Sequence, residues 1–200
     1  MGDGGAGTAE RDGRRVDASR RVDAEERARG LEGRTTTIEL FKERMKFSAG
    51  HFTIFDERHR ERLHGHNFGV FCALTGLVDD NGMLADYGEY KRDLQAVCDS
   101  LDEYFLLPGD SPHLTIRDAG PDRIEALFAD DVIPFLRKDV RVLPVRNVTL
   151  EELSRYLVQE LVKDDGRLTR DRLIEVVVKV SSGPGQTASH RWRSPSAILA

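Results

Sequence analysis

Apolar residues along this chain follow two spacings, one typical of strands and the other typical of helices. Residues 36–47 alternate loosely between apolar and polar side chains, and residues 67–77 are rich in Val, Phe and Leu, so both stretches are predicted to be strands. Residues 174–180 are strongly apolar and predict a third strand. Residues 79–82, Asp-Asp-Asn-Gly, have turn chemistry and predict a hairpin that continues into residues 83–85.

Two further stretches carry apolar residues at helical spacing. The first predicts a helix over residues 89–101. In the second, residues 149–152, Thr-Leu-Glu-Glu, form a capping box that opens a helix. Its buried stripe is expected to consist of Leu153, Tyr156, Leu157 and Leu161. The order of these elements predicts an α+β fold, with an antiparallel sheet and helices on one face.

A connection of about forty residues, 108–146, separates the two helices. The spacing of Ile124, Leu127 and Phe128 predicts a short helix within it, and residues 140–145 predict a strand. We expect a surface excursion that adds a hairpin and a helix to the edge of the sheet. A lid over a functional site is the alternative, because long ordered loops are often functional.

Composition separates residues 1–34 from the rest of the chain. This stretch holds eight acidic side chains, eight arginines and little to bury, so it cannot offset its own ordering entropy. We predict a disordered polar tail at residues 1–34 and one folded domain at residues 35–200. Since the charges of the tail balance, it is not a basic arm for nucleic acid; a docking segment is the alternative.

Charge and cysteine content favour a cytoplasmic protein. No apolar run has the length of a membrane span, and the N-terminus lacks the hydrophobic region of a signal peptide. The formal net charge of −5 argues against a general nucleic-acid binder. Cys72 and Cys98 provide no disulfide framework and are predicted to be reduced core residues. We therefore expect neither a nucleic-acid partner nor a membrane partner.

Three histidines carry most of the chemical information. His64 and His66 form a His-Gly-His motif, and on an extended segment both imidazoles point to the same face. His51, thirteen residues before His64, could complete a three-nitrogen site from a neighbouring strand. Three neutral imidazoles with one open position are the ligand set of a catalytic zinc. A pair of surface histidines near a turn is the alternative.

The residues around these histidines resemble a known family. The stretches concerned are Phe47-Ser-Ala-Gly-His51, Arg62-Leu-His-Gly-His-Asn-Phe68, Gly82-Met-Leu-Ala-Asp86-Tyr87, Leu101-Asp102 and Asn147-Val-Thr-Leu-Glu151. They resemble, in order, the motifs of the 6-pyruvoyl tetrahydropterin synthase / 6-carboxytetrahydropterin synthase family. The resemblance covers roughly residues 38–106 and 147–192.

This resemblance carries several implications. It implies a tunnelling fold, in which sheets from several subunits close into a barrel, and a homo-oligomer, commonly a hexamer, with pockets between subunits. It also implies Zn²⁺ held by His51, His64 and His66, where the ion binds oxygens of the side chain of a small heterocyclic substrate, a pterin. The connection at 108–146 is longer than the one usual in the family and reads as an insertion.

The chain departs from the family pattern at three positions. The family places a cysteine thiolate shortly before the His-x-His pair, whereas residues 56–62 here contain no cysteine. The family has a histidine after the aspartate that matches Asp102, and this chain has Glu103. Ser182 stands where a glutamate normally grips the pterin ring.

Two residues match the family's other ring-contacting segment, Thr149 and Glu151. The resemblance therefore implies that both bind substrate. A simpler alternative exists for each, because the Thr149 hydroxyl is explained as a helix N-cap and Glu151 as an acid in the first turn of a helix.

Glutamates near the motifs are the available substitutes for the missing thiolate: Glu57, Glu61 and Glu103. A carboxylate near a zinc-bound substrate can act as general base, particularly if partial burial raises its pKa. Some members of the family carry a glutamate in place of the cysteine and cleave dihydroneopterin-type side chains.

Two readings follow. The first is a zinc-dependent lyase acting on a pterin or related heterocycle by side-chain cleavage or elimination, with Glu61 or Glu103 as base and Asp102 supporting proton transfer. Under this reading the family's own synthase reaction is not expected. The second is a catalytically inactive relative that binds a pterin-like ligand.

Overall fold

A long mixed sheet forms the framework of the protein. The computed structural model describes residues 34–195. Within them, six strands are hydrogen-bonded in a continuous row and β1 (Thr35–Leu40) pairs antiparallel with β3. The row runs β10 (Gln186–Arg193), β9 (Leu173–Gly183), β3 (His64–Leu77), β2 (Lys46–His51), β4 (Tyr104–Pro108) and β8 (Val140–Leu143). The pairings β2–β4 and β4–β8 are parallel and the others antiparallel.

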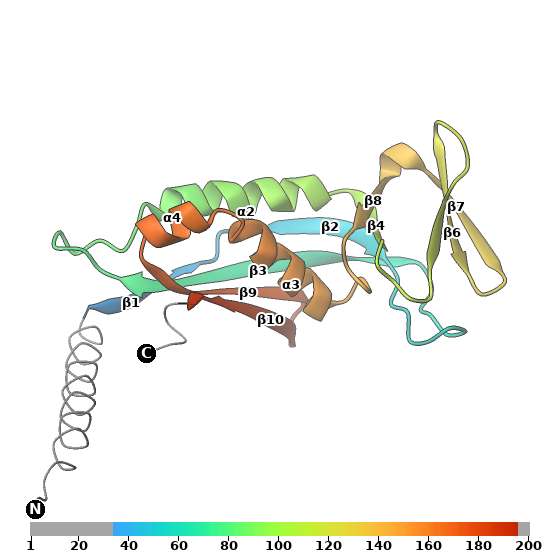
Figure 1. Ribbon diagram of the computed structural model, residues 1–200. Helices are drawn as coiled ribbons and strands as arrows, with labels where there is room; N and C mark the ends of the chain where they lie inside the picture. The colour runs from blue at the N-terminus through green and yellow to red at the C-terminus, as the bar shows by residue number, and fades with distance from the viewer. Residues whose placement is uncertain (1–33, 196–200) are drawn as a thin grey trace, which may run out of the picture.

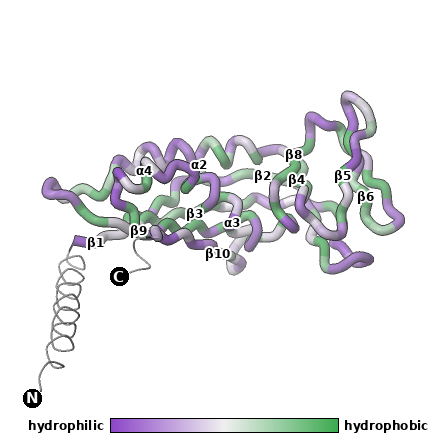
Figure 2. The backbone as a smooth tube through the Cα atoms, viewed as in Figure 1, coloured by the Kyte–Doolittle hydropathy of each residue, from purple (hydrophilic) through white to green (hydrophobic). Residues whose placement is uncertain are grey.

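Three helices cover one face of this sheet, as Figure 1 shows. They are α2 (Tyr87–Leu101), α3 (Leu150–Leu161) and α4 (Asp165–Arg170). From Phe68 onward, side chains alternate along β3, so that every second one is buried under the helices. In Figure 2, α2 changes between hydrophilic and hydrophobic colours along its length, as expected for a helix with one side on a core. The main core lies between the helices and the sheet.

The connection between β4 and β8 forms a second, smaller sheet. It consists of β5 (Thr115–Asp118), β6 (Arg123–Phe128) and β7 (Asp131–Leu136), paired antiparallel and followed by a 3-10 turn at Arg137–Asp139. Figure 1 shows it at one end of the main sheet. We call it the small sheet.

The small sheet builds its own core on the opposite face of the main sheet. Leu106 belongs to the main core, whereas its neighbours Phe105 and Leu107 contact the second cluster. Phe52 and Ile54, directly after β2, also belong to the second cluster. Because successive side chains of a strand point to opposite faces, the helices and the small sheet lie on opposite sides of this end of the sheet.

Several expectations about the elements are confirmed. Both predicted helices are present, and the Thr149 side chain accepts the Glu152 N–H as predicted for an N-cap. The predicted strands at 67–77 and 174–180 lie within β3 and β9. Cys72 and Cys98 are buried and unlinked, and burial raises the pKa of each thiol to about 12.

Other expectations about the elements were wrong. Residues 36–47 are not one strand, because a turn at residues 41–45 separates β1 from β2. Residues 83–85 form no strand and lead directly into α2. The short helix expected around Ile124 is strand β6, in which burial alternates along the strand. The sheet is mixed rather than purely antiparallel, because β4 and β8 run parallel to their neighbours.

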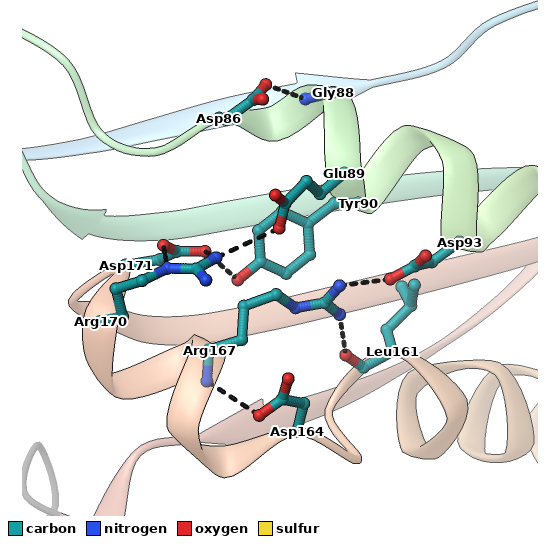
Figure 3. Close-up of polar contacts among 10 residues, drawn as sticks. All are labelled: Asp86, Gly88, Glu89, Tyr90, Asp93, Leu161, Asp164, Arg167, Arg170 and Asp171. Atoms are coloured by element: carbon teal, nitrogen blue, oxygen red, sulfur yellow. Dashed lines mark hydrogen bonds and ion pairs between the residues drawn. The ribbon is translucent and has the colours of Figure 1, made fainter.

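A polar cluster fastens α4 to α2, far from the small sheet (Figures 1 and 3). The Tyr90 hydroxyl donates to Asp171 at 2.7 Å, and Asp171 also accepts from Arg170 at 2.9 Å. Arg167 lies over the Tyr90 ring, 4.4 Å from its centroid, and pairs with Asp93. Burial acts to raise the pKa of Asp171, but the hydrogen bonds from Arg170 and Tyr90 outweigh it and lower the pKa.

Two further predictions concern the N-terminal tail and membrane-spanning segments. The disordered tail predicted for residues 1–34 lies outside the described residues, except for Arg34. Among the helices within residues 34–195, none is long and apolar enough to cross a membrane.

Candidate metal centre and active site

The three predicted imidazoles meet at one end of the sheet. His51 at the end of β2 pairs directly with His64 at the start of β3, and His66 is two residues further along the same face. One ring nitrogen from each histidine lies within 4.8 Å of the other two. The ring centroids of His51 are 4.5 Å from His64 and 5.3 Å from His66. The three imidazoles therefore converge, as the spacing of the histidines predicted.

Backbone carbonyls fix the orientation of two of the rings. His51 donates from Nδ1 to the Val148 carbonyl oxygen at 2.9 Å, and His64 donates from Nδ1 to the Arg62 carbonyl oxygen at 2.8 Å. In the neutral rings, Nε2 then carries a lone pair. Metal-binding histidines in proteins are held in this way, with the second ring nitrogen bonded to a carbonyl or carboxylate.

The Nε2 atom of His51 is buried and has no hydrogen-bond partner among the described residues. Buried polar atoms are normally paired, so this atom requires an explanation. His51 is only 6% exposed, and burial lowers its pKa against the opposing effect of the Val148 carbonyl. Its ring therefore stays neutral at physiological pH, as a metal ligand must. The donor set and the unpaired nitrogen fit a zinc ion.

Glu61 lies beside this centre. Its Oε2 is 3.9 Å from His64 Nε2 and accepts the Thr53 N–H at 2.9 Å. A backbone hydrogen bond from the Glu61 N–H to the Thr53 carbonyl oxygen, 2.8 Å, fixes the same position. Burial acts to raise the pKa of Glu61, but the hydrogen bonds from Thr53 and the charges of His64 and His51 lower it. Partial burial therefore does not raise the pKa of Glu61, and the side chain is a carboxylate at neutral pH.

Asn147 connects the loop after β2 to the start of α3. Its side-chain amide donates to the Ile54 carbonyl oxygen at 2.8 Å, and its Oδ1 accepts the N–H groups of Ile54 and Val148 at 3.1 and 3.0 Å. These bonds hold the carbonyl of Val148 near His51. Asn147 was given no role from the sequence, although its position two residues before the capping box at Thr149 is the signal that could have assigned one.

Asp102 and Glu103 lie at the neighbouring edge of β2 and do not join the imidazoles. Asp102 accepts the Ser48 N–H at 2.6 Å, and the Glu103 N–H donates to the Ser48 carbonyl oxygen at 2.8 Å. Glu103 has a positive φ of 62° and lines an open hollow of about 510 Å³ together with Ser48. His66 also lines this hollow, so Glu103 and one of the three imidazoles border the same open space.

The remaining predicted site residues, Thr149, Glu151 and Ser182, are on α3 and β9. Thr149 is the N-cap of α3, next to the Val148 carbonyl that holds His51. Glu151 is exposed in the first turn of α3. Ser182 follows the Gly69–Ser181 pair of β3 and β9 by one residue, and its hydroxyl lies 3.1 Å from the side-chain oxygen of Gln186.

The fold and the three-histidine centre together define a tunnelling-fold protein with a candidate metal site, and the comparisons with known proteins agree. A model of the family described as 6-pyruvoyl tetrahydropterin synthase matches residues 39–192. The chain belongs to the 6-pyruvoyl tetrahydropterin synthase family. Members of this family are lyases that act on pterins.

Individual relatives are similar over most of the described residues. A Methanocaldococcus jannaschii protein, provisionally named 6-carboxy-5,6,7,8-tetrahydropterin synthase, is 25% identical over 150 residues, which cover 74% of this chain and 90% of the relative. The structure of the Plasmodium falciparum 6-pyruvoyl tetrahydropterin synthase has a TM-score of 0.76 and 26% identity, covering 80% of this chain and 99% of that one.

A solved variant of the Plasmodium vivax 6-pyruvoyltetrahydropterin synthase is also similar to this chain. It replaces by alanine a glutamate that its description calls a catalytic residue. The TM-score is 0.75 and the identity 26%, covering 80% of this chain and 99% of that one.

Proposed function

We propose that this protein is a zinc-dependent lyase that cleaves the hydroxylated side chain of a pterin or a related heterocycle, with Glu61 as general base. The observation that carries the proposal is the position of the Glu61 carboxylate, 3.9 Å from His64 Nε2 and tied to Thr53. A solved relative whose glutamate is described as catalytic supports it.

The metal site of this proposal consists of His51, His64 and His66. The support is their convergence, the two carbonyl-fixed rings and the unpaired, buried Nε2 of His51. A zinc ion held there would supply Lewis-acid polarisation of substrate side-chain oxygens. Neither cysteine can replace Glu61, because both Cys72 and Cys98 are buried in the main core with raised thiol pKa values.

Glu61 suits removal of a proton from a hydroxyl group. In a retro-aldol cleavage it takes the proton of the hydroxyl on the second side-chain carbon, and the O–H electrons form a carbonyl. The bond between the first and second side-chain carbons breaks, and its electron pair passes into the C=N bond of the heterocycle. Protonated Glu61 then returns the proton to the first side-chain carbon, which yields an aldehyde and a hydroxymethyl heterocycle without any redox partner.

Asp102 and Glu103 belong to the proposal only in an oligomer. Within one chain neither carboxylate has a described hydrogen bond or ion pair with an imidazole: Asp102 accepts from Ser48, and Glu103 lines the open hollow that His66 also borders. A pocket formed between subunits would bring them to a second subunit's centre. We propose a homo-oligomeric, cytoplasmic protein in which Thr149, Glu151 and Ser182 contribute to substrate binding.

A second candidate function is a family member that binds a pterin-like ligand without turnover. Ser182 favours it, because a hydroxyl cannot accept two N–H bonds from an amino-pyrimidine edge as a carboxylate can.

The test is to incubate zinc-loaded protein with 7,8-dihydroneopterin and with its triphosphate, and to identify products by mass spectrometry. A hydroxymethyl pterin together with an aldehyde is the expected result. A pyruvoyl product with released triphosphate would contradict the proposed reaction. Stoichiometric binding without any product would instead establish the second candidate.

A further inference from the structure

The guanidinium of Arg60 joins the loop after β2 to the small sheet. It lies over two aromatic rings, 5.3 Å from the Phe52 centroid and 5.7 Å from the Phe128 centroid. Its Nη2 donates to Asp131 Oδ2 at 2.8 Å, at the β6–β7 turn of the small sheet. The Arg60 side chain is 18% exposed and that of Asp131 61% exposed. The charge of Arg60 is therefore mostly withdrawn from solvent.

The same guanidinium holds the backbone of Glu61. Arg60 Nη1 donates to the Glu61 carbonyl oxygen at 2.9 Å. Arg60 itself forms a β-bridge with Ile54, whose side chain belongs to the core of the small sheet. Two bonds between Thr53 and Glu61 complete this short ladder. The backbone on both sides of Glu61 is thus fixed by contacts that reach the small sheet.

We infer that the Arg60–Asp131 pair is a positioning contact, through which the small sheet holds the Glu61 carboxylate at the three-histidine centre. This inference rests on the proposed function, because it assigns Glu61 a catalytic task. Arg60 is a positioning residue, since its bonds go to the Glu61 backbone and to Asp131 and none of its described contacts is with an imidazole.

The geometry distinguishes this pair from an ordinary surface ion pair. Exposed pairs contribute little to stability, whereas Arg60 combines an ion pair, two ring faces and a backbone carbonyl. Its Nε is buried without a hydrogen-bond partner among the described residues. The guanidinium therefore leaves one of its own hydrogen bonds unmade in this position. We expect loss of the pair to loosen the loop much more than it lowers global stability.

The experiment uses Asp131→Asn in the zinc-loaded protein, with Asp131→Glu as the conservative variant. Asp118→Asn is the matched control, because Asp118 also pairs with an arginine of this region, Arg137, at 2.9 Å, and neither residue contacts the loop after β2. Hydrogen exchange of the Thr53 and Glu61 amides and steady-state turnover of a dihydropterin are measured for all four proteins.

The expected result has two parts. Asp131→Asn raises the exchange rates of both amides by roughly tenfold, and it lowers kcat by roughly tenfold with KM unchanged, because only the alignment of the base in the transition state is lost. Asp131→Glu restores both measurements, and Asp118→Asn changes neither. If the pair only stabilised the fold, Asp131→Asn would not lower kcat of the folded protein while leaving KM unchanged.

The failures of the two proposals are distinguishable. If the wild type turns over and Asp131→Asn matches it in exchange or in kcat, the positioning role is overturned. If the wild type gives no product, the proposed function fails, and hydrogen exchange alone decides whether the pair holds the Glu61 segment. Unchanged exchange in that case overturns the pair's role as well.

Discussion

His51 donates a hydrogen bond from Nδ1 to the carbonyl oxygen of Val148, a residue 97 positions later in the chain, at 2.9 Å. This bond leaves the buried Nε2 of His51 directed at the centre with no partner among the described residues. It also ties the start of α3 to the end of β2. The orientation of one proposed metal ligand therefore depends on the packing of a distant helix against the sheet.

Replacing Glu61 by glutamine should remove the base while leaving the metal centre intact. We expect kcat for a dihydropterin to fall by about 10²–10⁴-fold, with the zinc content and thermal stability close to those of the wild type. Steady-state kinetics and elemental analysis of the same preparation test this. Glu57→Gln, in an exposed residue of the same loop, serves as control and should turn over normally.

One outcome of that experiment would assign the role of general base to a different glutamate. If Glu61→Gln retained full activity and Glu103→Gln lost it, the carboxylate acting at the centre would be Glu103 of another subunit.

Gly50 leaves room for an aromatic ring, and an alanine there should destabilise the protein. A Cβ atom at this position would stand 2.5 Å from Cδ2 of Phe105, whose ring packs against Phe135 at 4.8 Å. Because the ring belongs to a packed cluster, we expect Gly50→Ala to lower the free energy of unfolding by about 1–3 kcal/mol. Denaturation by urea measures it.

A second substitution tests whether the ring is the cause. In the double variant Gly50→Ala/Phe105→Leu, the smaller side chain should recover part of the loss relative to the sum of the two single variants. Simple additivity would show that Gly50 is needed for another reason.

Asp171 should make stability depend on pH in the acidic range. Its pKa is lowered in the folded protein, so its contribution is complete above the unfolded value near 3.8 and is lost as the pH falls through the folded value. Asp171→Asn should lower the free energy of unfolding at pH 7 by about 1–3 kcal/mol and flatten its decline below about pH 4. Asp80→Asn, in an almost fully exposed carboxylate, is the control. Parallel pH profiles of the wild type and Asp171→Asn would refute this role.

The protein should form a homo-oligomer in solution. Strand β10 is one of the two end strands in the row of the main sheet, and among the described residues its eight residues leave one row of backbone groups without a neighbouring strand. Light scattering coupled to size-exclusion chromatography should give a mass several times that of the 22.5 kDa chain. A monomer would argue strongly against a pocket shared between subunits.

The sequence predicted the convergence of the three histidines, because the relevant geometry is local. Strand alternation alone places His64 and His66 on one face, and a neighbouring strand suffices to add His51. The capping box at Thr149 predicted α3 for a similar reason, since one side chain and one N–H three residues on define it.

The remaining features depended on contacts that spacing does not encode. Ile124, Leu127 and Phe128 fit a helical period, but burial at Ile124, Ala126 and Phe128 shows the period of a strand. The choice between Glu61 and Glu103 was open because it depends on which carboxylate the folded chain brings close to an imidazole nitrogen, and only the loop after β2 places Glu61 there. The lowered pKa of Glu61 arises from Thr53, a partner that only the folded loop provides.

The central claim is that His51, His64 and His66 hold one zinc ion, and the zinc content of natively purified protein tests it most directly. We predict about one zinc per subunit for the wild type and for His59→Ala, whose imidazole is exposed and pairs with Asp56. We predict loss of the metal in His64→Ala and in His66→Ala. Full occupancy in either of these two variants, or wild-type protein without metal after purification in zinc-containing medium, would contradict the account.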